Sequence, residues 1–249
     1  GRVAKMHVAD LRVVAYAPVG MNPEDIVLYK GYLLVANSGW GNDNTLTVID
    51  VATFDSIASI TVEWNPQQMV VAGDSVYLLA NGQYDANWNC PYYLQSIDVE
   101  NRTARTITNA THAVAYDGTL YLCYSETDWA TYETVNKFFT YDVETAVIYT
   151  DSFLKGDNEE TASNSVYMME VNPNNGELFI GLAGNKFVSS GIVHRFEQDG
   201  IFNTETGKQF RKFILAVGGK DQALDAFINF RKREPKIDAL LRHQGWTNA

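Results

Sequence analysis

Cysteine is scarce in this sequence, and long apolar runs are missing. Two cysteines, Cys90 and Cys123, in 249 residues exclude a disulfide scaffold and a zinc site made of cysteine alone, and we expect two free thiols. No apolar stretch approaches the roughly 18 residues of a membrane-spanning helix. No secretory signal is present, and the chain begins at Gly1 rather than Met, which indicates a processed protein or a fragment.

Several catalytic signatures are missing as well. The sequence has no phosphate loop, no nucleophile elbow and no dinucleotide-binding fingerprint. An acidic pair such as Glu126 and Glu133 lies on a polar loop, where nothing in the sequence would shift a pKa for acid–base work. We therefore expect no enzyme activity, no catalytic residue, no cofactor and no metal ion.

Basic residues are few and unevenly placed. The chain has 19 Lys and Arg against 30 Asp and Glu, a net charge of −11, so it is a poor general partner for nucleic acid or anionic membranes. Nine bases against five acids after residue 200 give +4, which leaves −15 for residues 1–200. All 14 tyrosines also lie before residue 200. This asymmetry predicts two units, 1–200 and 201–249.

A repeated pattern of short apolar runs fills the first unit. Three runs align on Leu33, Tyr77 and Tyr121 at spacings of 44 residues, and a weaker fourth aligns on Phe179. Turn formers such as Asp117-Gly118 separate the runs, which is typical of β-hairpins. A period of about 40–45 residues with four short strands per unit predicts β-propeller blades. An irregular β-sandwich is the alternative.

The fold class that follows is an all-β propeller of four to five blades, incomplete in this chain, followed by a short α-helical segment. The strands expected in the first blade cover residues 25–29, 32–37, 45–51 and 56–62. The second and third blades cover about 68–107 and 112–152, the fourth begins near 165, and residues 1–14 form the outer two strands of a preceding blade. Because an open arc exposes strand edges, we expect missing blades, a smaller closed ring or pairing between chains.

One stretch carries a resemblance to a known family. Residues 36–50, Ala-Asn-Ser-Gly-Trp-Gly-Asn-Asp-Asn-Thr-Leu-Thr-Val-Ile-Asp, resemble the repeat of YVTN/YncE-type propellers, which runs YVAN…NTVSVID. The pattern over residues 1–200 is similar to surface propellers of the Bacteroidetes, including their cobalamin-capturing lipoproteins. This resemblance implies an exported protein, periplasmic or at the cell surface. Such propellers usually close with about seven blades, more than this chain supplies.

The second unit changes period and carries a different resemblance. Apolar spacing over residues 203–249 predicts three short helices, with Gly218-Gly219 ending the first and Pro235 starting the third. The stretch REP-x-IDALLRH-x-G from Arg233 to Gly245 is similar to the C-terminal end of M3-family zinc oligopeptidases, over about 50 residues.

The chemistry of those peptidases cannot be assigned to this chain. Their catalytic HExxH helix is absent from the sequence, whose histidines are His7, His112, His194 and His243. We interpret the chain as a fusion of a propeller and a peptidase tail, which caps the propeller or packs against it. In the alternative, the helices belong to the propeller protein and the likeness is fortuitous.

The candidate binding residues lie on loops that propellers place at one face. These loops are rich in aromatic and amide side chains, which supply apolar area and directional hydrogen bonds. The candidate ligand-binding residues are Trp40, Asn42, Trp64, Asn65, Tyr84, Trp88, Tyr92, His112, Trp129 and Tyr132. In the alternative, the tryptophans pack loop against loop, and a lone His112 is more often structural than a ligand contact. A faint calcium pattern, Asn42-Asp-Asn44, lacks the glycine and glutamate of an EF-hand loop.

Three functions remain open from the sequence. The first is a non-enzymatic binding propeller, exported or surface-exposed, for a bulky nutrient such as a corrinoid (cobalamin) or a glycan. The second is an interaction scaffold that partners an outer-membrane transporter. The third is an inactive fusion that carries the C-terminal fragment of an M3 metallopeptidase.

Overall fold

The computed structural model describes residues 1–86, 90–155, 159–183 and 192–196. The chain is divided into two units, Gly1–Ile201 and Phe202–Ala249, and every described residue belongs to the first. The predicted helical tail over 201–249 lies outside the described residues and stays a prediction. Within the described ranges, no helix is both long and apolar enough to cross a membrane.

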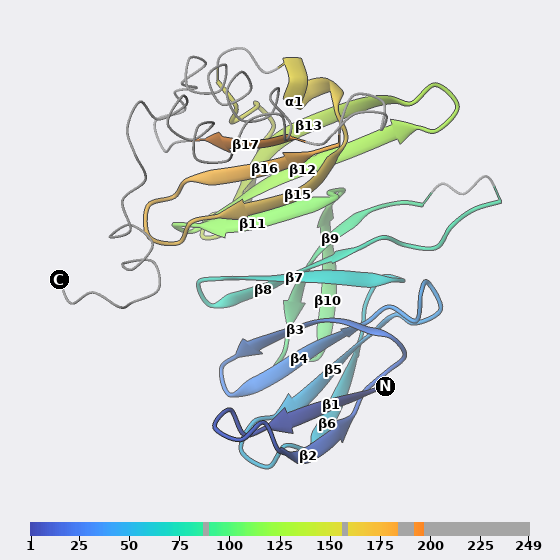
Figure 1. The fold of residues 1–249 in the computed structure, drawn as a ribbon, viewed down its shortest axis with the longest axis vertical. Helices are drawn as coiled ribbons and strands as arrows, with labels where there is room; N and C mark the ends of the chain where they lie inside the picture. The colour runs from blue at the N-terminus through green and yellow to red at the C-terminus, as the bar shows by residue number, and fades with distance from the viewer. Residues whose placement is uncertain (87–89, 156–158, 184–191, 197–249) are drawn as a thin grey trace, which may run out of the picture. The chain divides into compact units, whose positions relative to one another are not determined.

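Three consecutive sheets each consist of four antiparallel strands in chain order (Figure 1). Blade 1 contains β3 (Pro23–Tyr29), β4 (Tyr32–Asn37), β5 (Thr45–Asp50) and β6 (Ser56–Thr61). Blade 2 contains β7 (Pro66–Ala72), β8 (Ser75–Ala80), β9 (Tyr93–Asp98) and β10 (Thr103–Thr108). Blade 3 contains β11 (His112–Tyr116), β12 (Thr119–Asp128), β13 (Glu133–Asp142) and β14 (Val147–Tyr149).

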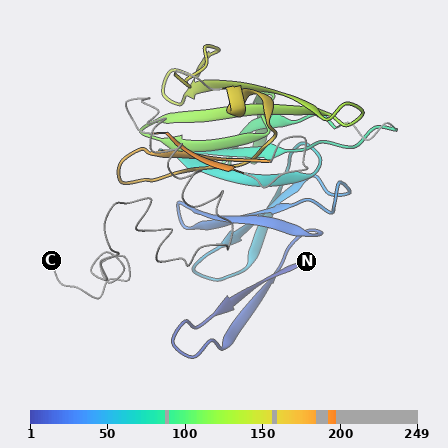
Figure 2. The ribbon, with the colours of Figure 1, turned by 45° about the horizontal axis from the view of Figure 1, so that its top comes forward.

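Two smaller sheets flank these blades. A half blade of β1 (Arg2–Met6) and β2 (Val13–Pro18) comes before blade 1, and Figure 2 shows it as a separate ribbon at the N-terminal end. Blade 4 contains β15 (Val166–Val171), β16 (Leu178–Leu182) and β17 (Ile192–Phe196), preceded by the short helix α1 (Glu159–Ser163). The succession of four-stranded meanders confirms the predicted all-β, propeller-like fold.

Tight turns set the register of the first hairpin in each complete blade. The turn residues Lys30 and Gly31 have φ of 45° and 85°, and Asp117 and Gly118 have φ of 46° and 74°. Positive φ at both central positions is the geometry whose twist matches that of paired strands, and glycine adopts it without steric cost. In blade 2 the turn begins with Gly73 at φ 56°.

The repeat alignment needs a one-residue correction in blade 1. The turn pairs Tyr29 with Tyr32 in blade 1 and Ala72 with Ser75 in blade 2, so the residue equivalent to Tyr77 is Leu34 rather than Leu33. A one-residue slip in a strand moves a side chain to the other face of the sheet. The sequence alignment matched Leu and Tyr by their similar neighbours and could not detect this change of face.

Apolar side chains fill the space between successive sheets. Between blades 1 and 2 the buried cluster includes Leu34, Leu46, Val76 and Leu78, all fully buried. Tyr77, Leu79 and Leu122 belong to a second cluster between blades 2 and 3, and Ala17 and Val35 to a third between the half blade and blade 1. β4 and β8 therefore alternate their side chains between two clusters, because both faces of these strands are covered.

An aspartate ends the third strand of each of blades 1 to 3 and has a structural role in the turn that follows. Asp50 Oδ1 accepts hydrogen bonds from the backbone amides of Ala52 and Thr53 at 2.8 and 2.9 Å. Asp98 and Asp142 accept the equivalent turn bonds from the amides three residues onward. The pKa of the Asp98 carboxyl is lowered chiefly by the Asn101 side chain, which donates to Oδ2 at 2.8 Å, and that of Asp142 chiefly by the Thr145 amide. The acid recurs in blades 1 to 3 because its carboxylate closes the turn between the third and fourth strands.

Candidate functional site

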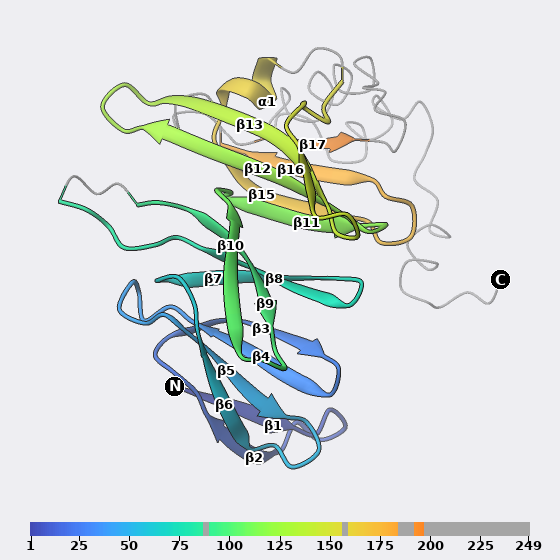
Figure 3. The same cartoon turned by 180° about the vertical axis from the view of Figure 1, so that it is seen from behind.

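Loops from several blades project at one end of the sheets. Figures 1 and 3 show the loop between β8 and β9 and the β12–β13 hairpin extending to the same side. In blade 1 the Gly39 amide donates to Met21 O at 2.9 Å, and in blade 2 the Gly82 amide donates to Trp64 O at 2.9 Å. The loop that enters each of these blades therefore lies beside the loop that follows its second strand, as the sequence predicts.

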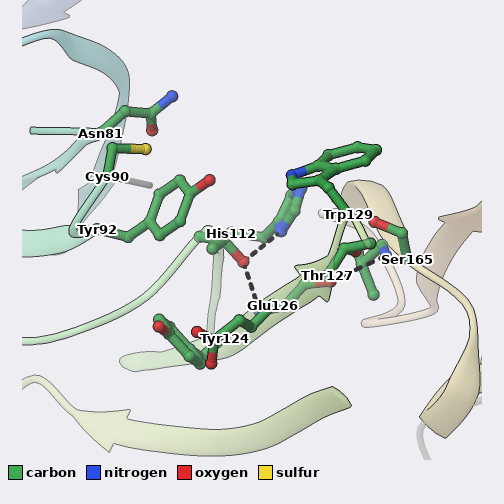
Figure 4. Close-up of a pocket in the computed structure, with 12 residues that line it drawn as sticks. Asn81, Cys90, Tyr92, His112, Tyr124, Glu126, Thr127, Trp129 and Ser165 are labelled. Atoms are coloured by element: carbon green, nitrogen blue, oxygen red, sulfur yellow. Dashed lines mark hydrogen bonds between the residues drawn. The ribbon is translucent and has the colours of Figure 1, made fainter. Parts of the chain in front are cut away.

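A cleft of about 260 Å³ opens at this end, among residues of blades 2, 3 and 4. Its lining residues are Asn81, Cys90, Tyr92, Thr111, His112, Tyr124, Ser125, Glu126, Thr127, Trp129, Ser165 and Val166. Figure 4 shows the Tyr92 ring on one side of His112 and the Trp129 indole on the other. The cleft thus combines aromatic rings with hydroxyl and amide groups, and Glu126 is the charged side chain of this lining set.

Thr111 organises the floor of the cleft through three contacts. Its hydroxyl lies 3.0 Å from Cys123 O, 2.9 Å from the Ser125 amide, which donates to it, and 2.9 Å from His112 Nδ1. Ser125 Oγ in turn accepts a hydrogen bond from the Val166 amide at 3.2 Å. The Val166–Ser125 bond connects blade 4 to blade 3 among the residues that line the cleft, and the Thr111 bonds order the blade 3 side of that lining.

His112 is half-buried between the two blades. Burial lowers the pKa of its imidazole, and a hydrogen bond with the Tyr167 backbone opposes that change. The ring is consequently neutral at pH 7. His112 occupies the same repeat position as Asp25 in blade 1, at an equal number of residues before the hairpin turn. Asp25 also bonds a backbone group of the next blade. The structure therefore gives His112 an inter-blade contact in addition to its place in the cleft.

A cluster of phenols and one thiol forms the blade 2 side. Cys90 is hydrogen-bonded to Tyr84 and Tyr92, and burial is the main cause that raises the pKa of both phenols. Tyr92 and Tyr124 meet edge to face, with ring centres 6.3 Å apart. Both thiols are free, as predicted, and burial raises the pKa of the Cys123 thiol, which keeps it protonated and unreactive.

Trp129 stands at the opposite margin, on the β12–β13 loop. Its indole is 61% exposed and meets the Tyr132 ring edge to face, with centres 6.4 Å apart. Tyr132 has φ 58°, and Asp128 Oδ1 accepts the Ala130 amide at 2.8 Å. The loop is therefore fixed by its own hydrogen bonds, and it leaves one indole available at the rim.

The structure brings some of the ten residues predicted from the sequence to the cleft. Tyr92, His112 and Trp129 line the cleft, and Tyr132 contacts Trp129. Five others lie outside the lining set: Trp40, Asn42, Trp64, Asn65 and Tyr84. Trp88 lies outside the described residues.

Two of those five have evident local roles. Asn65 is buried, and its φ of 59° serves the turn into β7, as Asn22 at φ 44° serves the turn into β3. Asn42 donates to Gly39 O at 3.1 Å and closes its own loop. Tyr124 and Ser125 also line the cleft, although the sequence predicts only a strand at these positions. Their position at the end of the β12 apolar run was the available signal.

The acid of the faint calcium pattern, Asp43, accepts hydrogen bonds from its own loop and from the loop that enters blade 1. Asp43 Oδ2 accepts the Met21 amide at 2.8 Å, and Oδ1 accepts the Thr45 hydroxyl at 2.7 Å. Among the described residues, no group of three or more His, Cys, Asp or Glu is placed to hold a metal ion.

The fold and this loop-end cleft define the class of the first unit, a β-propeller-like protein. Among solved structures, hydrazine synthase of Kuenenia stuttgartiensis is similar at a TM-score of 0.59 and 14% identity, covering 92% of this chain and 64% of that one. At this identity the likeness shows the fold alone.

Sequence comparison gives a different result at the C-terminal end. Residues 185–246 match Peptidase family M3. Oligopeptidase A of Haemophilus influenzae is 49% identical over 61 residues, and that of Escherichia coli is 53% identical over 51 residues. These alignments cover 24% and 20% of this chain but only 9% and 8% of the relatives. The chain thus contains a segment similar to a fragment of these peptidases.

The family match extends further toward the N-terminus than the predicted second unit. It begins at residue 185, upstream of the boundary expected at 200. The matched segment therefore includes β17. The backbone of β17 pairs with that of β16, from the pair of Leu178 with Phe196 to the pair of Leu182 with Ile192. A strand of blade 4 thus lies within the segment that is similar to the peptidases.

Proposed function

We propose that residues 1–200 form a non-enzymatic binding module that captures a bulky ligand at its loop end. The observation that carries this proposal is the cleft itself, in which Tyr92, Tyr124 and Trp129 surround a polar floor. Rigid aromatic side chains contribute large contact area at a low entropic cost, and hydroxyl and amide groups orient the ligand. An exposed indole beside a fixed floor is the kind of arrangement that binds a ring.

The size of the cleft limits how the ligand sits. At about 260 Å³ it is slightly smaller than the pockets of roughly 300–1,000 Å³ that enclose whole small ligands. A bulky nutrient would therefore place one ring or head group in the cleft and lie across the neighbouring loops. A corrinoid, with a flat ring bordered by amides, and a glycan both suit this mode. We propose a periplasmic or cell-surface location on the resemblance of residues 36–50 to exported propellers.

Trp40 supports a second candidate, a scaffold for a protein partner such as an outer-membrane transporter. Its indole is 79% exposed, and its φ is 53°, between Gly39 at 53° and Gly41 at 85°. The loop is held by Ser38, whose Oγ accepts the Trp40 amide and donates to Glu24 Oε1 at 2.7 Å. A tryptophan presented on a fixed loop has the properties of an interface anchor. For the peptidase-like segment we propose no activity.

Titration with cyanocobalamin tests the first proposal. Tryptophan fluorescence, corrected for absorption by the ligand, is measured for the unaltered chain, for Trp129→Ala and for Trp40→Ala as the matched control outside the cleft. Saturable quenching that is lost in Trp129→Ala and kept in Trp40→Ala supports corrinoid capture at the cleft. Loss in Trp40→Ala alone would move the site to blade 1. Absence of saturation with cyanocobalamin and with a panel of oligosaccharides would contradict the binding proposal.

A further inference from the structure

The charge of the cleft suggests which head group it accepts. Glu126 is the charged side chain among the residues that line it, and His112 is neutral at pH 7. The Glu126 side chain is hydrogen-bonded to Tyr124, which places the carboxylate beside one of the three aromatic rings. No Lys or Arg belongs to the lining set of the described residues. The cleft therefore presents a negative charge and aromatic rings, with no positive side chain among the groups that line it.

The three aromatic rings surround the space from different elements. Tyr92 comes from β8–β9, Tyr124 from β12 and Trp129 from the β12–β13 loop. The faces of such rings attract a cation within about 6 Å of their centres, and Trp is the strongest of them. Ring sets of this kind recognise quaternary ammonium groups, which have no N–H to satisfy and so lose little on leaving water.

One contact in the structure already shows this attraction. The Lys137 ammonium lies 5.9 Å from the centre of the Tyr124 ring. Lys137 is paired with Tyr124 across β12 and β13 and is not among the residues that line the cleft. A cation inside the cleft would meet attraction from Glu126 and weaker repulsion from Lys137, whose position outside the lining set leaves it more screened by water.

We propose that the cleft of blades 2 to 4 binds an alkylated ammonium group, with Tyr92, Tyr124 and Trp129 against its methyl groups and Glu126 supplying the opposite charge. This inference rests on the proposed function in one respect, that the cleft is a ligand site. It names the chemical class of the head group, whereas the corrinoid proposal concerns a bulky ring. The two therefore have separate tests.

The test compares choline with 3,3-dimethylbutan-1-ol, its uncharged carbon analogue of the same shape. Affinities for the full chain are measured by isothermal titration calorimetry at constant ionic strength, and saturation-transfer NMR identifies the ligand protons nearest the protein. We expect saturable choline binding, with the N-methyl protons nearest the protein. The analogue is expected to bind about tenfold more weakly, because the charge adds both ring and carboxylate attraction.

Three variants assign the effect to the cleft. Trp129→Ala is expected to abolish choline binding, Glu126→Gln to weaken it several-fold, and Lys137→Gln to strengthen it. Trp129 and Glu126 are exposed, so these variants are expected to fold, which circular dichroism verifies. Leu28→Ala, at an exposed position of β3 outside the cleft, is the unchanged control.

Several outcomes would overturn the proposal. Equal affinity for choline and its analogue would show an apolar site without charge recognition. Choline binding that survives both Trp129→Ala and Glu126→Gln would place the site elsewhere. Absence of choline binding in a chain that binds cyanocobalamin at the cleft would overturn the ammonium proposal and leave the proposed function intact. Choline binding without cyanocobalamin binding would reject the corrinoid and retain the cleft as a cation site.

Discussion

The Asp25 carboxylate accepts a hydrogen bond of 2.7 Å from the backbone amide of Met69. This bond joins β3 and β7, the first strands of two successive blades. The other carboxylate oxygen of Asp25 accepts the Ile26 amide at 2.7 Å. Met69 is buried, with 5% of its surface exposed, so its amide has no water to replace the carboxylate. A single acid thus satisfies a buried donor of the next blade and fixes the spacing of two repeats.

Replacing this acid tests how much it contributes. Asp25→Ala leaves the Met69 amide unsatisfied and is expected to lower the free energy of unfolding by about 1–3 kcal/mol, the usual range for an orphaned buried donor. Asp25→Asn keeps an acceptor oxygen and is expected to lose less. Urea denaturation followed by circular dichroism measures both. If Asp25→Asn lowers the free energy of unfolding as much as Asp25→Ala does, the position requires the negative charge and not only an acceptor oxygen.

The cluster between blades 1 and 2 is expected to carry much of the stability of the first unit. Leu78 is fully buried within it, so Leu78→Ala is expected to cost about 2–5 kcal/mol through lost burial and the cavity left behind. Leu28→Ala is the matched control, since Leu28 lies in β3 but is 64% exposed, and it is expected to change stability by less than about 0.5 kcal/mol. Thermal and urea unfolding provide the comparison. Equal effects would contradict the assignment of this cluster as core.

The backbone conformation of Trp40 is expected to lower the free energy of unfolding of the first unit. A non-glycine residue at φ 53° is strained by about 1 kcal/mol, and an indole that is 79% exposed gains little from packing. Trp40→Gly is therefore expected to raise the free energy of unfolding by up to about 1 kcal/mol. Trp40→Ala keeps the strained backbone and serves as the comparison. A clear destabilisation by glycine in the same urea titration would mean that the indole packs against the protein.

The protonation of His112 predicts a dependence of stability on pH. Because burial lowers its pKa in the folded state, the unfolded chain binds a proton more readily below the ordinary value of about 6.5. The contribution of His112 is therefore fully present above pH 6.5 and is lost as pH falls toward the folded-state pKa. The slope cannot exceed about 1.4 kcal/mol per pH unit for one proton.

The variant His112→Gln isolates this contribution. Free energies of unfolding measured by urea titration between pH 7.5 and pH 5 are expected to fall more steeply for the unaltered chain than for the variant. The acids with lowered pKa, Asp98, Asp128 and Asp142, titrate below this window and affect both chains alike. Parallel curves would show that His112 is exposed enough to accept its proton in the folded state.

The sequence by itself determined the repeat and hence the blades. Alternating apolar residues and the turn pairs Lys30-Gly31 and Asp117-Gly118 are local signals, because strand period and turn geometry depend on neighbouring residues. They located strands such as 32–37 to within a residue or two of the observed bounds. The two free thiols were also expected from the sequence.

Only the tertiary structure decided which residues meet. Trp40 and Trp129 occupy matching loops in the sequence, yet one stands alone on blade 1 and the other borders a cleft with Tyr92 and Tyr124. The face of the sheet on which the Leu33 side chain lies depends on the strand register, and a shift of one residue moves that side chain to the other face. Similarly, Asp25 and His112 share a repeat position, but the backbone groups that they meet, at Met69 and Tyr167, belong to the next blade. Contacts between blades join residues about 40 positions apart, and no local pattern in the sequence records them.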